Sequence, residues 1–142
     1  MVNGKRMRLD IVSAEDALFS ADALRVVVSC SMGEVGVVPG HAHFLSALKP
    51  GGVRVLTPDS DTEEVFYISG GFVEVQPDHV TILADVALRG DDLDEAEALA
   101  AEERAKTMLE SGEKKDYGTA LAELYEAAAR VRLIRSLRDK RS

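Results

Sequence analysis

The amino-acid sequence predicts an N-terminal flattened antiparallel β-sandwich followed by a C-terminal antiparallel hairpin of two α-helices. Two observations lead to this fold class. From Met7 to about Ala87, short apolar runs alternate with turn residues, a spacing that is typical of all-β domains. After Gly90 the pattern becomes helical, with alanine-rich segments that contain no proline. The chain has 142 residues, 46% of them hydrophobic, which is enough to build a core in a first domain of residues 1–90.

Six segments of this first domain are expected to be strands. They are residues 7–12, 23–30, 52–56, 64–70, 72–76 and 79–85. In the first of them Met7, Leu9 and Ile11 share one face, as a half-buried strand requires. Pro77 and Asp78 are turn residues between the last two segments, which predicts a hairpin there. The short connections favour an antiparallel sandwich or flattened barrel over a parallel sheet.

The second domain, residues 91–142, is expected to be the helical hairpin. Asp92 and Glu95 have the spacing of a capping box at the start of the first helix, and Asp116 is expected to cap the second. The expected apolar face of the second helix consists of Tyr117, Leu121, Leu124, Ala128, Val131 and Leu137. The alanines expected to bury surface are Ala96, Ala100, Ala101, Ala105, Ala120, Ala127, Ala128 and Ala129. Because buried alanine contributes little apolar area, we expect the two helices to be held together weakly.

Composition excludes several classes of protein. The net charge of -8 argues against a chain whose whole surface binds nucleic acid or an anionic membrane. No apolar stretch approaches the roughly 20 residues that span a bilayer, and the first residues lack the apolar segment of a signal peptide. We therefore expect no direct membrane insertion, and a protein that is cytosolic or held at a membrane by a partner. The single cysteine, Cys30, follows a run of valines and is expected to be a buried thiol in a reducing compartment.

Charge is sorted along the second domain. Residues 91–110 carry eight carboxylates against two basic side chains, a balance of -6. Residues 130–142 carry six basic side chains against one carboxylate, a balance of +5. Acidic helix starts and basic helix ends suit the helix macrodipole, so capping and solubility are one interpretation. The other is that the arginine-rich end docks on an acidic surface of a partner protein.

The stretch GEVGVVPGHAHF, residues 33–44, contains the best candidate for enzyme chemistry. On a strand, His41 and His43 would point to one face, as in cupin-like metal-binding enzymes. Such a site also needs a carboxylate shortly after His43, which the sequence lacks, and a histidine from a neighbouring strand. His79 follows a Pro-Asp turn and is expected in a loop. No metal, catalytic or phosphate-binding motif is complete, so a cupin-like enzyme is kept as an alternative. A third possibility is an adaptor whose basic tail, residues 130–142, binds nucleic acid or lipid.

Four stretches together carry a resemblance to a known family. They are DIVSAED, GEVGVVPGHA with LKPG after it, FYISGGFVEVQPDHVTILAD, and LRGDDLDEAEA. In this order and register they are similar to the epsilon subunit of the bacterial rotary, proton-translocating ATP synthase, from about Arg8 to the end of the chain. The resemblance implies a ten-stranded sandwich and a helical hairpin. It also implies a non-catalytic central-stalk subunit without cofactors, which couples the gamma shaft to the membrane c-ring and inhibits ATP hydrolysis through its C-terminal helices.

The resemblance further implies partners and contact residues. The sandwich would bind the gamma subunit, and Glu34 and His41 would contact the membrane ring from a loop shaped by glycines and Pro39. His43 departs from the proline common at that position. The C-terminal helices would reach the alpha and beta subunits, with an inhibitory contact through Arg130, Arg132, Arg135 and Arg138. The protein would sit on the cytoplasmic face of the bacterial inner membrane, bound peripherally and without nucleic acid.

One feature of some relatives is degenerate. Their ATP-binding motif reads Ile or Leu, Asp, two variable residues, Arg and Ala. Here the corresponding positions are Leu93, Asp94, Glu97 and Ala98. Glu97 places a carboxylate where an arginine would meet phosphate, so we expect weak or absent nucleotide binding.

Overall fold

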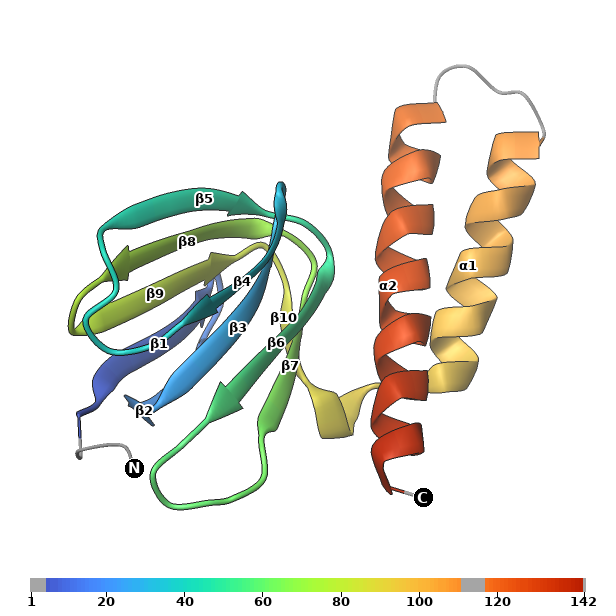
Figure 1. Ribbon diagram of the computed structural model, residues 1–142. Coiled ribbons are helices and arrows are strands. Elements are labelled where there is room, and N and C mark those ends of the chain that lie inside the picture. Colours follow the sequence, from blue (N-terminus) through green and yellow to red (C-terminus); the bar gives the residue numbers. More distant parts are fainter. Residues whose placement is uncertain (1–4, 111–116, 142) are drawn as a thin grey trace. The chain divides into compact units, whose positions relative to one another are not determined.

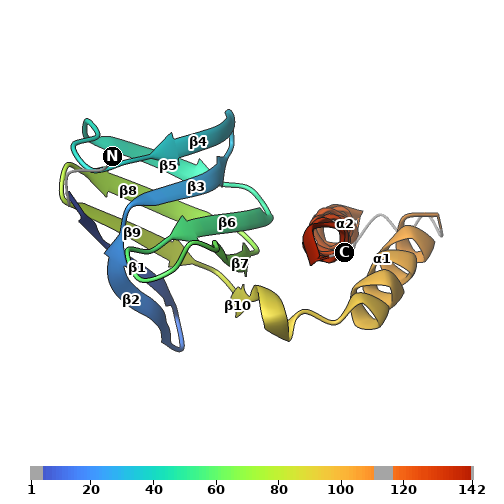
Figure 2. The same ribbon diagram turned by 60° about the horizontal axis from the view of Figure 1, so that its bottom comes forward.

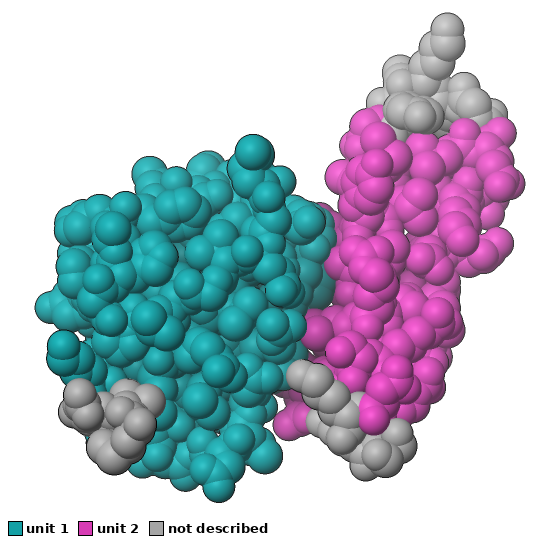
Figure 3. All heavy atoms as spheres, viewed as in Figure 1, with its two compact units in different colours: residues 1–89 teal, residues 90–142 magenta. Residues whose placement is uncertain are grey.

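The computed structural model describes residues 5–110 and 117–141, which form ten strands, one 3-10 helix and two α-helices (Figure 1). The strands are β1 (Met7–Ser13), β2 (Ala17–Ala23), β3 (Arg25–Cys30), β4 (Gly33–Val37), β5 (Phe44–Leu48), β6 (Gly51–Leu56), β7 (Glu64–Ile68), β8 (Gly71–Gln76), β9 (His79–Ala84) and β10 (Ala87–Arg89). The helices are η1 (Gly90–Asp92), α1 (Glu95–Glu110) and α2 (Tyr117–Arg141). The chain divides into two compact units, residues 1–89 and 90–142, which are coloured separately in Figure 3.

The strands of the first unit form one sheet that curls on itself into a sandwich (Figure 2). Their order is β10-β7-β6-β3-β5-β8-β9-β1-β2, and β4 pairs with β3. The two ends of this path come together, because Arg89 of β10 donates a hydrogen bond from Nη2 to the carbonyl of Leu18 in β2 at 3.0 Å. The predicted sandwich followed by two helices is confirmed.

One strand pair differs from the antiparallel expectation. β1 pairs with β9 in parallel, with Arg8 opposite His79 and Ile11 opposite Ile82, while the other pairs in the described sheet are antiparallel. Residues 7–13 and 79–84 are distant in sequence, so no turn residues between them predict that they pair. The parallel contact joins the start of the sandwich to its penultimate strand.

The sandwich core is built by the alternation that the sequence shows. Met7, Leu9 and Ile11 of β1 are almost completely buried, as predicted, while Arg8 between them is exposed. The rest of the core consists of Ala23, Val26, Val28, Cys30, Val37, Leu48, Val53, Val55, Phe66, Ile68, Val73, Val75, Val80, Ile82 and Ala84. Cys30 is therefore the buried thiol that its valine-rich context predicts.

The second unit begins with a cap that the sequence analysis placed wrongly. Asp92 lies in η1, and the residue before α1 is Asp94, whose Oδ1 accepts a hydrogen bond from the backbone N–H of Glu97 at 3.2 Å. Asp94 and Glu97 have the same spacing as Asp92 and Glu95, so the pattern fits both pairs and the structure selects the second. The expected cap at Asp116 lies outside the described residues.

The two helices pack antiparallel along a seam of small side chains (Figure 1). Ala98 and Ala105 of α1 and Ala120 and Ala127 of α2 are almost completely buried, at spacings of seven residues that keep each pair on one helix face. The prediction that alanines form the contact between the helices is confirmed, but two of the alanines expected to be buried, Ala96 and Ala100, are exposed. No helix in residues 5–110 and 117–141 is both long and apolar enough to cross a membrane.

An ion pair stands at the end of this seam. Arg138 of α2 and Glu95 at the start of α1 approach to 3.3 Å. The arginine side chain is 62% exposed, so water screens the pair and we expect it to add only about 0.2–1 kcal/mol. The hairpin therefore depends on the close approach of its helices rather than on strong individual contacts.

Candidate partner-binding surfaces

The stretch GEVGVVPGHAHF is only partly the loop that the sequence suggested. Its first five residues are β4, which pairs along its whole length with β3. Gly33 and Gly40 have positive φ values of 130° and 89°, so a glycine is needed at both turns that bracket β4. Gly36 lies within the strand and has no positive φ, so it does not shape a loop.

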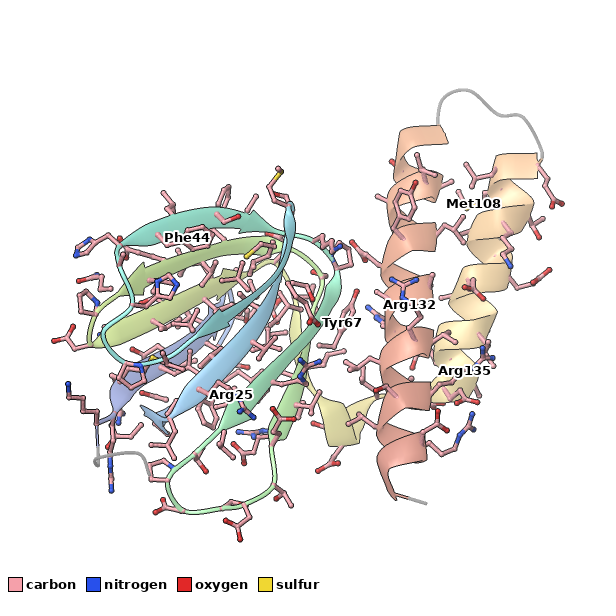
Figure 4. All side chains as sticks on the ribbon, viewed as in Figure 1. Arg25, Phe44, Tyr67, Met108, Arg132 and Arg135 are labelled. Carbon is pink, nitrogen blue, oxygen red and sulfur yellow. The ribbon has the colours of Figure 1, made fainter. Side chains whose placement is uncertain are left out.

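Glu34 projects from β4 into a chain of charges on the outer surface of the sandwich. Its Oε2 lies 3.5 Å from Nη1 of Arg54 in β6, and Nε of Arg54 lies 4.0 Å from Oε2 of Glu63. Arg25 of β3, labelled in Figure 4, approaches the same Glu63 oxygen to 3.3 Å. Glu34 is the most exposed member, with 58% of its side chain accessible. Two arginines and two glutamates thus form a charge-balanced network.

His41 lies in the connection after β4 and not on a strand. Its Nδ1 donates a hydrogen bond to the carbonyl of Ala42 at 2.7 Å, and its ring meets the ring of Phe44 edge to face at 6.2 Å. Phe44 begins β5 (Figure 4). These two contacts give the half-buried imidazole a fixed orientation at the opposite end of β4 from Glu34.

The premise of the cupin-like alternative is wrong. His41 and His43 both lie in the connection between β4 and β5, so no strand aligns them. His79 was expected in a loop but is the first residue of β9, where the pairing of β1 with β9 extends the strand. Among the residues that the structure describes, no group of three potential metal ligands comes together.

His79 instead takes part in a polar network on the outer face of β9, β1 and β2. Its Nε2 lies 2.8 Å from Oδ2 of Asp10, and the hydroxyl of Ser20 donates a hydrogen bond to Oδ1 of Asp10. Arg8 donates from Nη2 to the Ser20 oxygen at 2.8 Å. The bond from Ser20, with smaller contributions from His79 and Arg8, holds the pKa of Asp10 below its ordinary value although burial opposes this shift.

Beside this network lies an apolar row that the sequence analysis missed. The strand register places Ala47 of β5 opposite Phe72 of β8, Phe72 opposite Leu83 of β9, and Leu83 opposite Val12 of β1. Each of the four has a core residue next to it on its strand, so these four side chains face outward together. These core neighbours are Leu48, Val73, Ile82 and Ile11. Phe72 and Leu83 are 55% and 54% exposed, and Leu45 on the same face is 71% exposed. We call Val12, Leu45, Ala47, Phe72 and Leu83 the apolar face.

Such a face is unusual for an isolated domain. Singly exposed apolar residues are normal, but a contiguous outward row across four strands is typical of a surface that binds another protein. A sequence signal for it exists, since the outward positions of an amphipathic strand are normally polar, and Phe72 and Leu83 break that rule. Without the register, however, the two breaks could not be assigned to one surface.

The degenerate nucleotide motif lies around the start of α1. Asp94 caps the helix, Ala98 is buried in the seam, and Leu93 lines a cavity of about 380 Å³. The cavity is formed by Gly90, Asp91, Leu93, Glu95, Ile134, Leu137 and Arg138. Arg138 in this cavity is paired with Glu95, so it is less available to bind a triphosphate.

The four arginines predicted to form the inhibitory contact do not share one environment. Arg132 and Arg135, labelled in Figure 4, are exposed on α2. Arg130 is half-buried, and Arg138 is paired with Glu95. Since successive helical residues are rotated by about 100°, Arg130 also points to a different side of α2 from Arg132.

Comparison with known proteins identifies the family. The model for the beta-sandwich domain of the ATP synthase delta/epsilon chain matches residues 6–90, and the model for its long alpha-helix domain matches residues 91–135. The chain therefore belongs to the ATP synthase delta/epsilon chain family.

Within this family the similar curated proteins are epsilon chains. The ATP synthase epsilon chain of Nitrosomonas eutropha is 49% identical over 139 residues, covering 97% of this chain and 99% of that one. The epsilon chain of Thioalkalivibrio sulfidiphilus is 51% identical over 131 residues, covering 92% and 93%.

Solved structures share the fold at lower identity. A chain in the Euglena gracilis mitochondrial ATP synthase (OSCP/F1/c-ring, rotational state 1) matches with a TM-score of 0.80 and 20% identity, covering 88% of this chain and 79% of that one. A chain in the central stalk/c-ring of the Tetrahymena thermophila mitochondrial ATP synthase matches with a TM-score of 0.55 and 15% identity, covering 92% and 95%.

Proposed function

We propose that this chain is a non-catalytic rotor subunit of the proton-translocating ATP synthase. In this role the sandwich binds the gamma subunit and contacts the membrane c-ring, and the helical hairpin restrains ATP hydrolysis. Membership of the delta/epsilon family supports this proposal, as do the fold matches to chains of ATP synthases described with a c-ring or central stalk. The chain would be held peripherally at the cytoplasmic face of the membrane by its partners.

The apolar face is the observation that carries the proposal. A rotor subunit must stay bound while it turns with the shaft, and a lasting contact needs an apolar centre that excludes water. The apolar face offers this on a rigid sheet whose backbone is fixed by its ladder of hydrogen bonds. We therefore assign the apolar face to the gamma subunit.

Two substitutions test this assignment. Completing the burial of a half-exposed Phe72 or Leu83 is worth roughly half of the 1.5–3 kcal/mol for full burial, so Phe72→Ser or Leu83→Ser should weaken gamma binding about 4- to 12-fold. Val38→Ser is the matched control, because Val38 is 52% exposed but lies outside the apolar face. Titration of the full chain with purified gamma measures the three affinities. Equal affinities for all three variants would exclude the apolar face as the gamma-binding surface.

The ring contact is assigned to Glu34 and His41. Both side chains are held by neighbours before any partner arrives, Glu34 by Arg54 and His41 by Ala42 and Phe44. Ordered polar groups lose less side-chain entropy on binding. ATP-driven proton pumping in membranes that contain the complete enzyme should fall in Glu34→Gln and His41→Ala variants, and unchanged pumping in both would remove this assignment.

The inhibitory role is assigned to the arginines of α2. Exposed Arg132 and Arg135 are available to acidic segments of the beta subunits without any change in the hairpin. Arg138 is engaged by Glu95 and would join them only when the hairpin opens. The weak alanine seam suits an element with two arrangements of similar free energy.

A further inference from the structure

On the outer surface of the sandwich, the side chain of Arg54 links Glu34, the proposed ring contact, to Glu63. Arg54 of β6 reaches Glu34 across β3, which lies between β4 and β6 in the sheet. Neighbouring strands are about 4.8 Å apart, and Glu34 is offset by two residues along β4 from Gly36, which shares the row of Arg54. The two Cα atoms are therefore separated by about 12 Å in the plane of the sheet. Only a long side chain can bridge that distance and still fix a carboxylate.

Arg54 is itself held in place. Its Nε lies 4.0 Å from Glu63, and Glu63 is also engaged at 3.3 Å by Arg25. The side chains of Arg54 and Glu63 are 36% and 23% exposed, so they are the least exposed members of the network. The ion pairs therefore connect Arg25, Glu63, Arg54 and Glu34 in that order, and Glu34 at the end of the series is the most exposed, at 58%.

We propose that Arg54 is a positioning residue for the ring contact, which it serves by orienting the Glu34 carboxylate without touching the ring. This inference rests on the proposed function, in which Glu34 meets the ring. Nη1 of Arg54 lies 3.5 Å from Oε2 of Glu34, and this ion pair limits the rotamers of a side chain that stands on an edge strand. A carboxylate ordered in advance loses less entropy when it docks.

The expected size of the effect follows from that entropy. Immobilising one flexible side chain on binding costs about 0.5–1.5 kcal/mol, which corresponds to an affinity change of about 2- to 12-fold. Loss of Arg54 should therefore weaken ring binding by this factor. Because the Arg54–Glu34 contact is partly exposed, the effect should shrink as the ionic strength is raised.

A double-mutant cycle tests the inference. The full chain, in complex with gamma, is titrated onto the isolated membrane ring as the wild type, Glu34→Gln, Arg54→Met, and the double variant. Arg54→Met keeps most of the aliphatic stem and removes the charge, Arg54→Lys restores a charge at similar reach, and Arg25→Met is the matched control that leaves the Glu34 contact intact. Urea unfolding of each variant checks that the sandwich is retained.

The expected result is that Glu34→Gln and Arg54→Met each weaken binding, that the double variant is no weaker than Glu34→Gln alone, and that Arg54→Lys recovers most of the affinity. Arg25→Met should bind nearly as the wild type. If Arg54→Met binds as the wild type while Glu34→Gln does not, or weakens binding equally in the Glu34→Gln background, the positioning role is wrong and the ring contact stands. If Glu34→Gln binds as the wild type, the ring contact and the positioning role are both wrong.

Discussion

The alanine seam of the helical hairpin gives the most specific prediction about regulation. Replacing Ala105, which is fully buried, by leucine inserts three additional carbon atoms between helices that alanine allows to approach closely. Overpacking of this kind costs typically 1–3 kcal/mol. The matched control is Ala100→Leu, because Ala100 is on the same helix but is exposed.

The structure sets the scale against which this cost acts. The four buried alanines of the seam, Ala98, Ala105, Ala120 and Ala127, each contribute about 0.8 kcal/mol for the methyl group, or roughly 3 kcal/mol together. The ion pair of Arg138 with Glu95 adds about 0.2–1 kcal/mol. A penalty of about 1–3 kcal/mol is therefore comparable with the contribution of these four alanines, and it should shift the ratio of closed to open hairpins by about 5- to 150-fold.

Distances between two spin labels measure this shift in the isolated full chain. Cysteines for labelling can replace Glu103 on α1 and Ser136 on α2, which are both exposed, and the native Cys30 is too deeply buried to react. Ala105→Leu should add a population at long distance, and Ala100→Leu should match the parent. If Ala105→Leu and Ala100→Leu gave the same distance distribution, the reasoning that the seam controls opening would be refuted.

Three further predictions concern other parts of the chain. Gly71→Ala should lower the free energy of unfolding by more than the roughly 1–3 kcal/mol of a strained backbone. The reason is that Gly71 has a φ of 132° and that an added Cβ would lie 2.0 Å from a backbone oxygen. Gly36 has open space around it, so Gly36→Ala should change the free energy of unfolding little. Urea denaturation compares the two, and equal midpoints would contradict the strain. The pKa of Asp10 is lower in the folded state, so its stabilising contribution is present above about pH 4 and is lost as the pH falls through the folded pKa. Asp10→Asn should therefore reduce the loss of stability on acidification. The same loss in the variant and the wild type would contradict this. Isothermal titration should detect no tight ATP binding, and Glu97→Arg should increase whatever binding exists; tight binding by the wild type would overturn this.

Local patterns predicted those strands whose inward and outward residues differ clearly. β1, β8 and β9 alternate, and the Pro77-Asp78 turn between β8 and β9 is confirmed by the pairing of Gln76 with His79. Four strands lie outside the six expected segments, namely β2, β4, β5 and β10, and the first two of these have weak intrinsic preference. β4 contains two glycines in five residues and β2 is rich in small and polar residues, so their strand conformation depends on pairing with β3 and β1.

For the candidate surfaces too, the sequence indicates single residues but not the contacts between residues on different strands. The individual residues Glu34 and His41 could be selected by resemblance, but the contact between Glu34 and Arg54 requires strands that are separated by β3. The apolar face likewise appears only when the register aligns Phe72 with Leu83. Similarly, two equally spaced pairs of acidic residues precede α1, and only the backbone path decides that Asp94 is the cap.

We expect the two units to divide the work of the subunit, and truncation after Gly90 separates their roles. The chain shortened to residues 1–90 is reconstituted with the remaining subunits of the enzyme, and ATP synthesis, ATP-driven proton pumping and ATP hydrolysis are measured together. Synthesis and pumping should persist while hydrolysis rises, because the sandwich keeps its contacts and the arginines of α2 are gone. Loss of synthesis and pumping, or hydrolysis that stays at the level of the full chain, would contradict it.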